Sequence, residues 1–127
     1  MKPLATITVL AHLGVSIVHG YAHSQLGVGL TTWQNSYVLL VITVAPLVAL
    51  ALVWTGRVRI GFILLALAMA GSFIFGGYYH YIAISPDHVS HLPPGDAQAM
   101  FRFTAVLLMV TELFGVIVGV IGLRRIR

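Results

Sequence analysis

Cysteine is absent from this chain of 127 residues, and charged residues make up only 8% of it. Without cysteine there is no disulfide, no thiolate metal site and no cysteine nucleophile. In soluble domains about a quarter of the residues are charged, so the low charge excludes an ordinary water-soluble protein. Among the charged residues, the three acidic ones are fewer than the seven basic ones. These absences indicate a membrane protein.

Several functional motifs are also missing. The sequence has no glycine-rich phosphate loop, no serine nucleophile elbow and no nucleic-acid-binding module. The net charge of +4 comes from basic residues that lie between and beyond apolar segments. We therefore interpret this charge as a signal of membrane topology and predict no nucleic-acid partner. The sequence assigns no catalytic residue.

Long apolar segments dominate what is present. Hydrophobic residues make up 59% of the chain, and the mean hydropathy is +1.00. Four segments, residues 4–22, 33–55, 60–82 and 100–123, are each long enough to cross roughly 30 Å of hydrocarbon as a helix. We predict an all-α integral membrane protein, a four-span antiparallel transmembrane helix bundle, with residues 1–127 as a single domain. Pro46 should kink the second span and free a carbonyl near Ile42.

The basic residues predict the orientation. With four spans, one basic residue, Arg102, lies on one side of the membrane. The other side carries Lys2, Arg57, Arg59, Arg124, Arg125 and Arg127. Basic residues favour the cytoplasmic side, so we expect both termini in the cytoplasm and the first and third links outside. A bacterial inner membrane is the expected location.

A line of polar residues runs along the first span. It consists of Thr8, His12, Ser16, His19 and His23, at spacings of four, four, three and four. At about 100° per residue these side chains fall in a stripe roughly 80° wide on one helical face. Histidine is costly in hydrocarbon and usually faces a bundle interior or a watery cavity. The stripe is therefore predicted to face inward.

Five of the six histidines should gather at the outer end of the bundle. They are His19, His23, His80, His88 and His91. The four-residue spacing of the first two lets both imidazoles reach one ion. Residues 85–91 are predicted to form a capped helical turn with the two loop histidines on one side, beside Asp87. Nitrogen and carboxylate ligands suit copper, zinc or iron, so these five histidines are the predicted metal ligands.

Haem is the alternative ligand for the same residues. A b-type haem in a four-helix bundle takes one axial histidine from each of two helices. His23 with His80 satisfies this requirement, as does His19 with His80. Gly76 and Gly77, one turn before His80, leave room for a flat macrocycle or for close helix packing. This alternative makes the protein an electron-transfer subunit.

A second polar pair is predicted near mid-membrane. His12 and Glu112 lie at matching depths on the first and fourth spans, which are neighbours in an up-down bundle. Each needs a polar partner where water is scarce. We expect them to lie within about 4 Å or to be linked through one water. The pair is then either a proton relay or a polar clasp between helices.

The predicted function is that of a small polytopic membrane protein with an outward-facing, histidine-rich metal site, serving redox chemistry or metal handling. The alternatives are the haem subunit and a non-catalytic accessory subunit of a larger membrane complex. The expected partners are the lipid bilayer and either further copies of the chain or that larger complex. Gly115-x-x-x-Gly119, a small-residue face, is a candidate contact between copies.

Overall fold

The computed structural model describes residues 1–126, and Arg127, one of the basic residues used to predict the orientation, lies outside them. The described residues form helices and no strand. The elements are α1 (Lys2–Leu26), α2 (Thr32–Tyr37), the π-helix η1 (Val38–Val44), α3 (Ala45–Trp54), α4 (Val58–Tyr81) and α5 (Gln98–Arg124). Because α2, η1 and α3 continue one another, there are four helices long and apolar enough to cross a membrane. The predicted fold class is confirmed.

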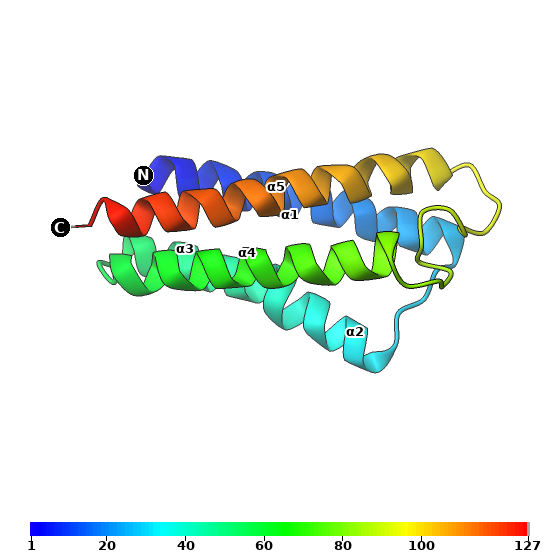
Figure 1. Ribbon diagram of the computed structural model, residues 1–127, viewed down its shortest axis with the longest axis horizontal. Coiled ribbons are helices and arrows are strands. Elements are labelled where there is room, and N and C mark those ends of the chain that lie inside the picture. Colours follow the sequence, from blue (N-terminus) through cyan, green and yellow to red (C-terminus); the bar gives the residue numbers. More distant parts are fainter. Residues whose placement is uncertain (127) are drawn as a thin grey trace.

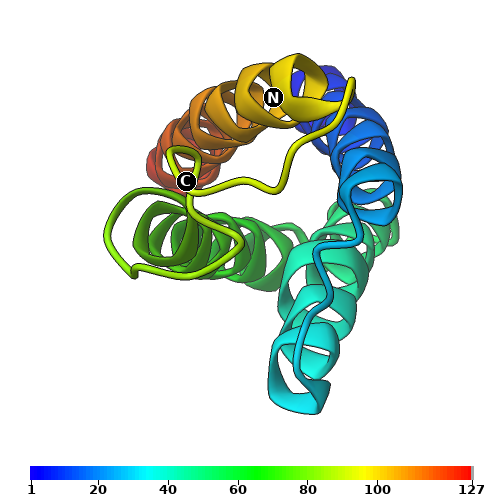
Figure 2. The same ribbon diagram turned by 90° about the vertical axis from the view of Figure 1, so that its right-hand side faces the viewer.

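The four spans run antiparallel. Both termini and the turn between α3 and α4 lie at one end of the molecule, and the two longer links lie at the other (Figure 1). Viewed from the end, α5 lies between α1 and α4, and α3 packs against α4 and, more lightly, against α1 (Figure 2). The two long links therefore cover the end that carries His23 and His80.

The bundle is closed at the end that carries the termini. There the Trp54 indole N–H donates to the Thr6 hydroxyl at 3.0 Å, and the Lys2 amine lies 5.5 Å from the centre of the Trp54 ring. Beneath this contact lies an apolar core of Ala5, Val9, Ala49, Val53, Phe62, Leu65, Met69 and Val118. This end of the bundle therefore leaves little room for a ligand.

The small-residue face of α5 is covered within the chain. A Cβ on Gly115 would lie 2.5 Å from Met69, and one on Gly122 would lie 2.4 Å from Phe62, both in α4. A Cβ on Gly119 would meet the backbone nitrogen of Ala66 at 2.8 Å. These glycines let α4 and α5 approach closely. The suggested dimer contact through this face is therefore corrected: its partner is α4 of the same chain.

Gly119→Ala is expected to lower the free energy of unfolding by about 1–3 kcal/mol, because the new methyl group overpacks against a backbone that cannot move aside. Gly14→Ala is the matched control, since nothing lies within 4 Å of a Cβ there and alanine favours a helix. Denaturant titration in detergent micelles, followed by circular dichroism, measures the difference. Equal stability of the two variants would contradict the close packing of α4 and α5.

The bend in the second span has a local cause. Proline has no backbone N–H, so Pro46 cannot donate to the carbonyl of Ile42 four residues earlier. The chain widens there into the π-helix η1, and such turns often accompany functional sites. The Ile42 carbonyl instead accepts a hydrogen bond from His12 Nε2 at 3.2 Å. His12 thus joins α1 to the second span at the bend.

Beyond the bend, α2 leans away from α1 (Figure 2). Its contacts are with α4: the Tyr37 hydroxyl donates to the carbonyl of Gly71 at 3.1 Å, and its ring stacks on Phe75 at 4.6 Å. A capping box between Thr31 and Gln34 fixes the start of α2. The seam between α1 and the second span is therefore closed at His12 and opens towards the long links.

Candidate metal centre

Three histidines from two spans meet at the open end of the bundle. His19 and His23 lie four apart on α1, and His80 lies in the last turn of α4. One ring nitrogen from each lies within 4.8 Å of the others. The ring centre of His19 is 4.9 Å from that of His23 and 4.9 Å from that of His80, both edge-on. The predicted group of ligands from α1 and α4 is thus brought together.

Phe101, at the start of α5, contacts all three rings. Its ring centre lies 4.5 Å from that of His19, 4.8 Å from that of His23 and 5.4 Å from that of His80. Its side chain is fully buried, so it shields one side of the cluster from water. No sequence pattern indicated a role for this aromatic residue.

Two of the imidazoles are fixed by backbone carbonyls. His23 Nδ1 lies 3.1 Å from the carbonyl oxygen of Val28, and His80 Nδ1 lies 3.1 Å from the carbonyl oxygen of Asp87. A carbonyl oxygen only accepts hydrogen bonds. Both Nδ1 atoms therefore carry the proton and donate, and in each neutral ring Nε2 keeps a free lone pair.

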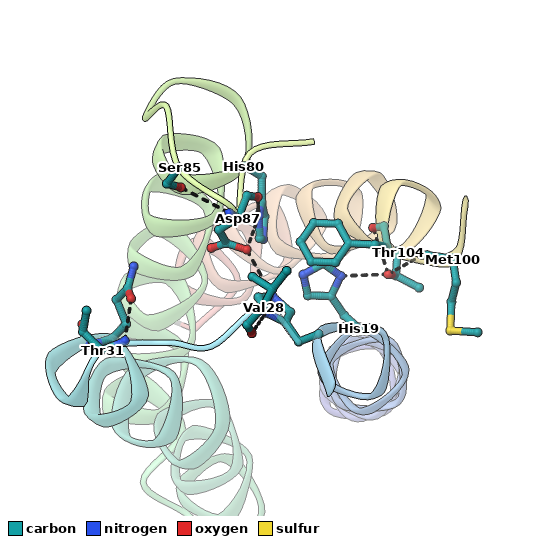
Figure 3. Close-up of polar contacts among 11 residues, drawn as sticks. His19, Val28, Thr31, His80, Ser85, Asp87, Met100 and Thr104 are labelled. Atoms are coloured by element: carbon teal, nitrogen blue, oxygen red, sulfur yellow. Dashed lines mark hydrogen bonds and ion pairs between the residues drawn. The ribbon is translucent and has the colours of Figure 1, made fainter. Parts of the chain in front are cut away.

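His19 is fixed in the same way by a hydroxyl group. Its Nδ1 lies 2.8 Å from Thr104 Oγ1, and that hydroxyl lies 2.7 Å from the carbonyl oxygen of Met100 (Figure 3). Since the Thr104 proton is donated to Met100, Thr104 Oγ1 accepts from His19 Nδ1–H. His19 therefore also presents a free Nε2. Metal-binding histidines almost always donate their second ring N–H to such an oxygen.

The link between α4 and α5 places Asp87 beside these rings. The Ser85 hydroxyl accepts from the Asp87 backbone N–H at 3.3 Å, and the Val89 N–H donates to the carbonyl of His80 at 3.0 Å. Asp87 Oδ1 lies 3.3 Å from His23 Nε2 and 3.3 Å from His80 Nδ1 (Figure 3). The carboxylate thus faces inward, at the centre of the cluster.

Asp87 is charged at neutral pH. Burial raises the pKa of the Asp87 carboxyl group, but the hydrogen bond from His80 and the electrostatic influence of the surrounding imidazoles outweigh this effect and hold the pKa below its ordinary value. The cluster therefore combines three imidazoles with one negative charge, a set of groups that attracts a cation.

One cavity connects the polar atoms that lack partners. Among residues 1–126, the buried side-chain atoms without a hydrogen-bond partner are His19 Nε2, Asp87 Oδ1 and Glu112 Oε2. All three residues line the same cavity of about 410 Å³, together with His23 and His80. Asp87 Oδ1 has its ion-pair contacts with His23 and His80, but His19 Nε2 and Glu112 Oε2 have no partner in the described part of the chain. Buried polar atoms normally find partners, so these two atoms mark the cavity as a binding site.

The two loop histidines do not join the cluster. Residues 85–91 form turns rather than the predicted helical turn. His88 and His91 bond to each other, with their Nδ1 atoms 3.1 Å apart, and His91 is exposed. The reason is the contact of Val89 with His80, which turns Asp87 inward and the histidines outward. The residue that this loop contributes is therefore Asp87.

The predicted direct contact of His12 with Glu112 is absent from the described residues. The ion pairs found there within 4.0 Å are those of Asp87 with His23 and with His80. His12 Nε2 donates to Ile42, and its Nδ1 lies 3.5 Å from the Thr111 hydroxyl. The carbonyl left free by Pro46 is the nearer partner for His12. Glu112 instead lines the cavity of the three histidines, and a link through one water stays a prediction.

Comparisons with known proteins do not add to this description. No protein-family model, no curated protein and no solved structure matches the chain. We therefore interpret the site from its own geometry.

Proposed function

We propose that the protein binds one transition-metal ion through Nε2 of His19, His23 and His80. The observation that carries this proposal is the shared tautomer of the three rings. Each donates its Nδ1–H to an oxygen, so each keeps a free Nε2 lone pair, and all three residues line one cavity with the anionic Asp87. Asp87 acts as the neighbouring carboxylate that orients His80 and balances the charge of the ion.

A proton explains this arrangement less well than a metal ion. A second proton on His23 would pair it with Asp87 Oδ1, 3.3 Å away. That proton would leave His19 Nε2 without a partner, although it is buried in the same cluster. A single cation between the rings gives His19 and His23 a partner, and Asp87 beside it balances the charge.

The ligands favour zinc, copper or iron, because imidazole suits these ions and the chain has no cysteine to supply a thiolate. Sites that hold a metal for structure are usually closed by four protein ligands, whereas three histidines leave a coordination position for a small molecule. We therefore favour metal-dependent chemistry or metal handling over a purely structural ion.

We favour an ion over a haem for geometric reasons. A haem between two axial histidines needs a flat slot between their rings. Here the ring centres of His23 and His80 are only 6.2 Å apart, and His19 lies edge-on to both rings, so no flat slot separates them. Gly76, which was expected to leave room for the macrocycle, faces the Glu112 carboxyl group and His80. A single ion fits this crowded set of rings.

Elemental analysis and an absorbance spectrum of the purified protein test the proposal. We expect about one equivalent of zinc, copper or iron and no Soret band. A Soret band would favour the haem subunit. Protein that is folded but retains neither metal nor haem, even after incubation with these ions, would contradict the proposal and favour the accessory subunit.

We also propose that the site faces away from the cytoplasm in a bacterial inner membrane. The end with the termini carries Lys2, Arg57, Arg59, Arg124 and Arg125. A reporter fused to the C-terminus should therefore be active in the cytoplasm, and a cysteine placed at Gly95 should react with an impermeant label from outside. A C-terminal reporter that is active only on the outer side would overturn this orientation.

A further inference from the structure

Glu112 has no role in the metal site as proposed. It is 2% exposed, and its Oε2 has no hydrogen-bond partner. It nevertheless lies near the site. A Cβ atom added to Gly76 would lie 3.8 Å from His80 Cδ2 and 3.9 Å from Glu112 Oε2, so both side chains border the same small space. A molecule bound at the metal can therefore also touch the Glu112 carboxyl group.

The cavity between these groups is mostly apolar. Its walls include Val38, Ile42, Phe75 and Leu108. Its volume of about 410 Å³ lies within the range of small-molecule pockets, roughly 300–1,000 Å³. Phe75, which stacks on Tyr37, and the imidazoles line this cavity and can make aromatic contacts with a bound ring. The polar groups are Glu112 at one place, the histidines with Asp87 at another, and Ser16 and Asn35 between the helices. This distribution suits a ligand with polar atoms on an apolar body.

The cavity is bordered by two helices that diverge. Ser16 and Gly20 of α1 lie on one side, and Asn35, Val38 and Ile42 of the second span lie on the other. These helices touch at His12 and Ile42 and separate towards the long links, where α2 leans away from α1 (Figure 2). Both helices belong to membrane spans, so the gap between them faces the lipid.

We propose that this cavity binds a quinol or similar phenol, which enters from the bilayer between α1 and the second span. One ring hydroxyl donates to Glu112 Oε2, and the ring lies against Phe75 beside the metal. The apolar tail leaves through the gap next to Val38. This inference rests on the proposed metal site, because the ligand lies against the ion held by the three histidines.

The test uses zinc-loaded protein in nanodiscs, because zinc has no redox chemistry and cannot consume the probe. A short-tailed benzoquinol, kept reduced under argon, is titrated by calorimetry, and zinc content is measured on the same samples. We expect saturable binding of one quinol per chain. Glu112→Leu should weaken it at least tenfold. Val38→Trp should abolish it by filling the gap, while Leu39→Trp, at a 58% exposed position outside the cavity lining, should leave it unchanged.

The zinc measurement separates this inference from the proposed function. If the wild-type protein keeps its zinc but shows no saturable quinol binding, the inference alone is overturned. The inference alone is also overturned if n-decanol, which has a hydroxyl but no ring, binds in the cavity as tightly as the quinol. It is overturned as well if Val38→Trp and Leu39→Trp bind the quinol equally well while both keep zinc. If the wild-type protein keeps no zinc, the proposed metal site and the inference both fail.

Discussion

His23→Ala and His80→Ala are each expected to lower the metal affinity more than about a hundredfold, because loss of an outer-shell partner alone costs about 10–100-fold and here a ligand is lost. With one ring removed, two imidazoles remain, and Asp87 loses one of the two histidines that its carboxylate contacts. Titration with zinc in competition with a chelator of known affinity measures the change.

His91→Ala is the matched control for this experiment. His91 is an exposed histidine on the neighbouring link, bonded to His88 rather than to the cluster. Its replacement should change the metal affinity by much less than either ligand variant. Full metal occupancy in both His23→Ala and His80→Ala would show that the cluster is not the metal site.

Thr104→Val is expected to weaken metal binding by about 10–100-fold, as is typical when the outer hydrogen bond of a metal-binding histidine is lost. Valine keeps the shape of threonine but has no hydroxyl to accept from His19 Nδ1–H. The ring can then rotate or place its proton on Nε2, which removes the lone pair. The same chelator competition measures the effect.

Thr104→Ser is the control that separates the effect of the hydroxyl group on metal affinity from the effect of side-chain shape, since serine keeps the hydroxyl and loses a methyl group. It should bind metal nearly as well as the wild-type protein. If Thr104→Val binds metal as tightly as Thr104→Ser, the hydrogen bond does not orient His19, and the assignment of its tautomer is wrong.

The fold could be predicted because each span carries its own signal. Apolar length defines the helices, and the spacing of His19 and His23 defines a shared face that does not depend on the rest of the chain. His80 could be added from its depth at the end of another span. The π-helix η1 could not be predicted in the same way, since Pro46 indicates a bend but not how the neighbouring turns rearrange.

The roles of Asp87 and Glu112 could not be predicted, for two different reasons. Asp87 faces inward because the backbone of Val89 bonds to His80, a contact that no local pattern encodes. Glu112 was paired with His12 because their depths on neighbouring spans match and each needs a polar partner, but neither reason fixes the rotation of α5 about its axis.

A signal for Thr104 was present but unused. Thr104, Leu108 and Glu112 recur every four residues, so they share one face of α5. The polar residues at both ends of that run are buried. A buried hydroxyl at the depth of His19 could have been recognised as a partner for its ring.

X-ray absorption spectroscopy of the metal-loaded protein shows whether His19, His23 and His80 hold the ion. We expect three imidazole nitrogens at about 2.0–2.1 Å from a bound zinc ion, with the imidazole signal reduced in His19→Ala. A first shell without imidazole, or one that is unchanged in His19→Ala, would contradict the proposed metal site.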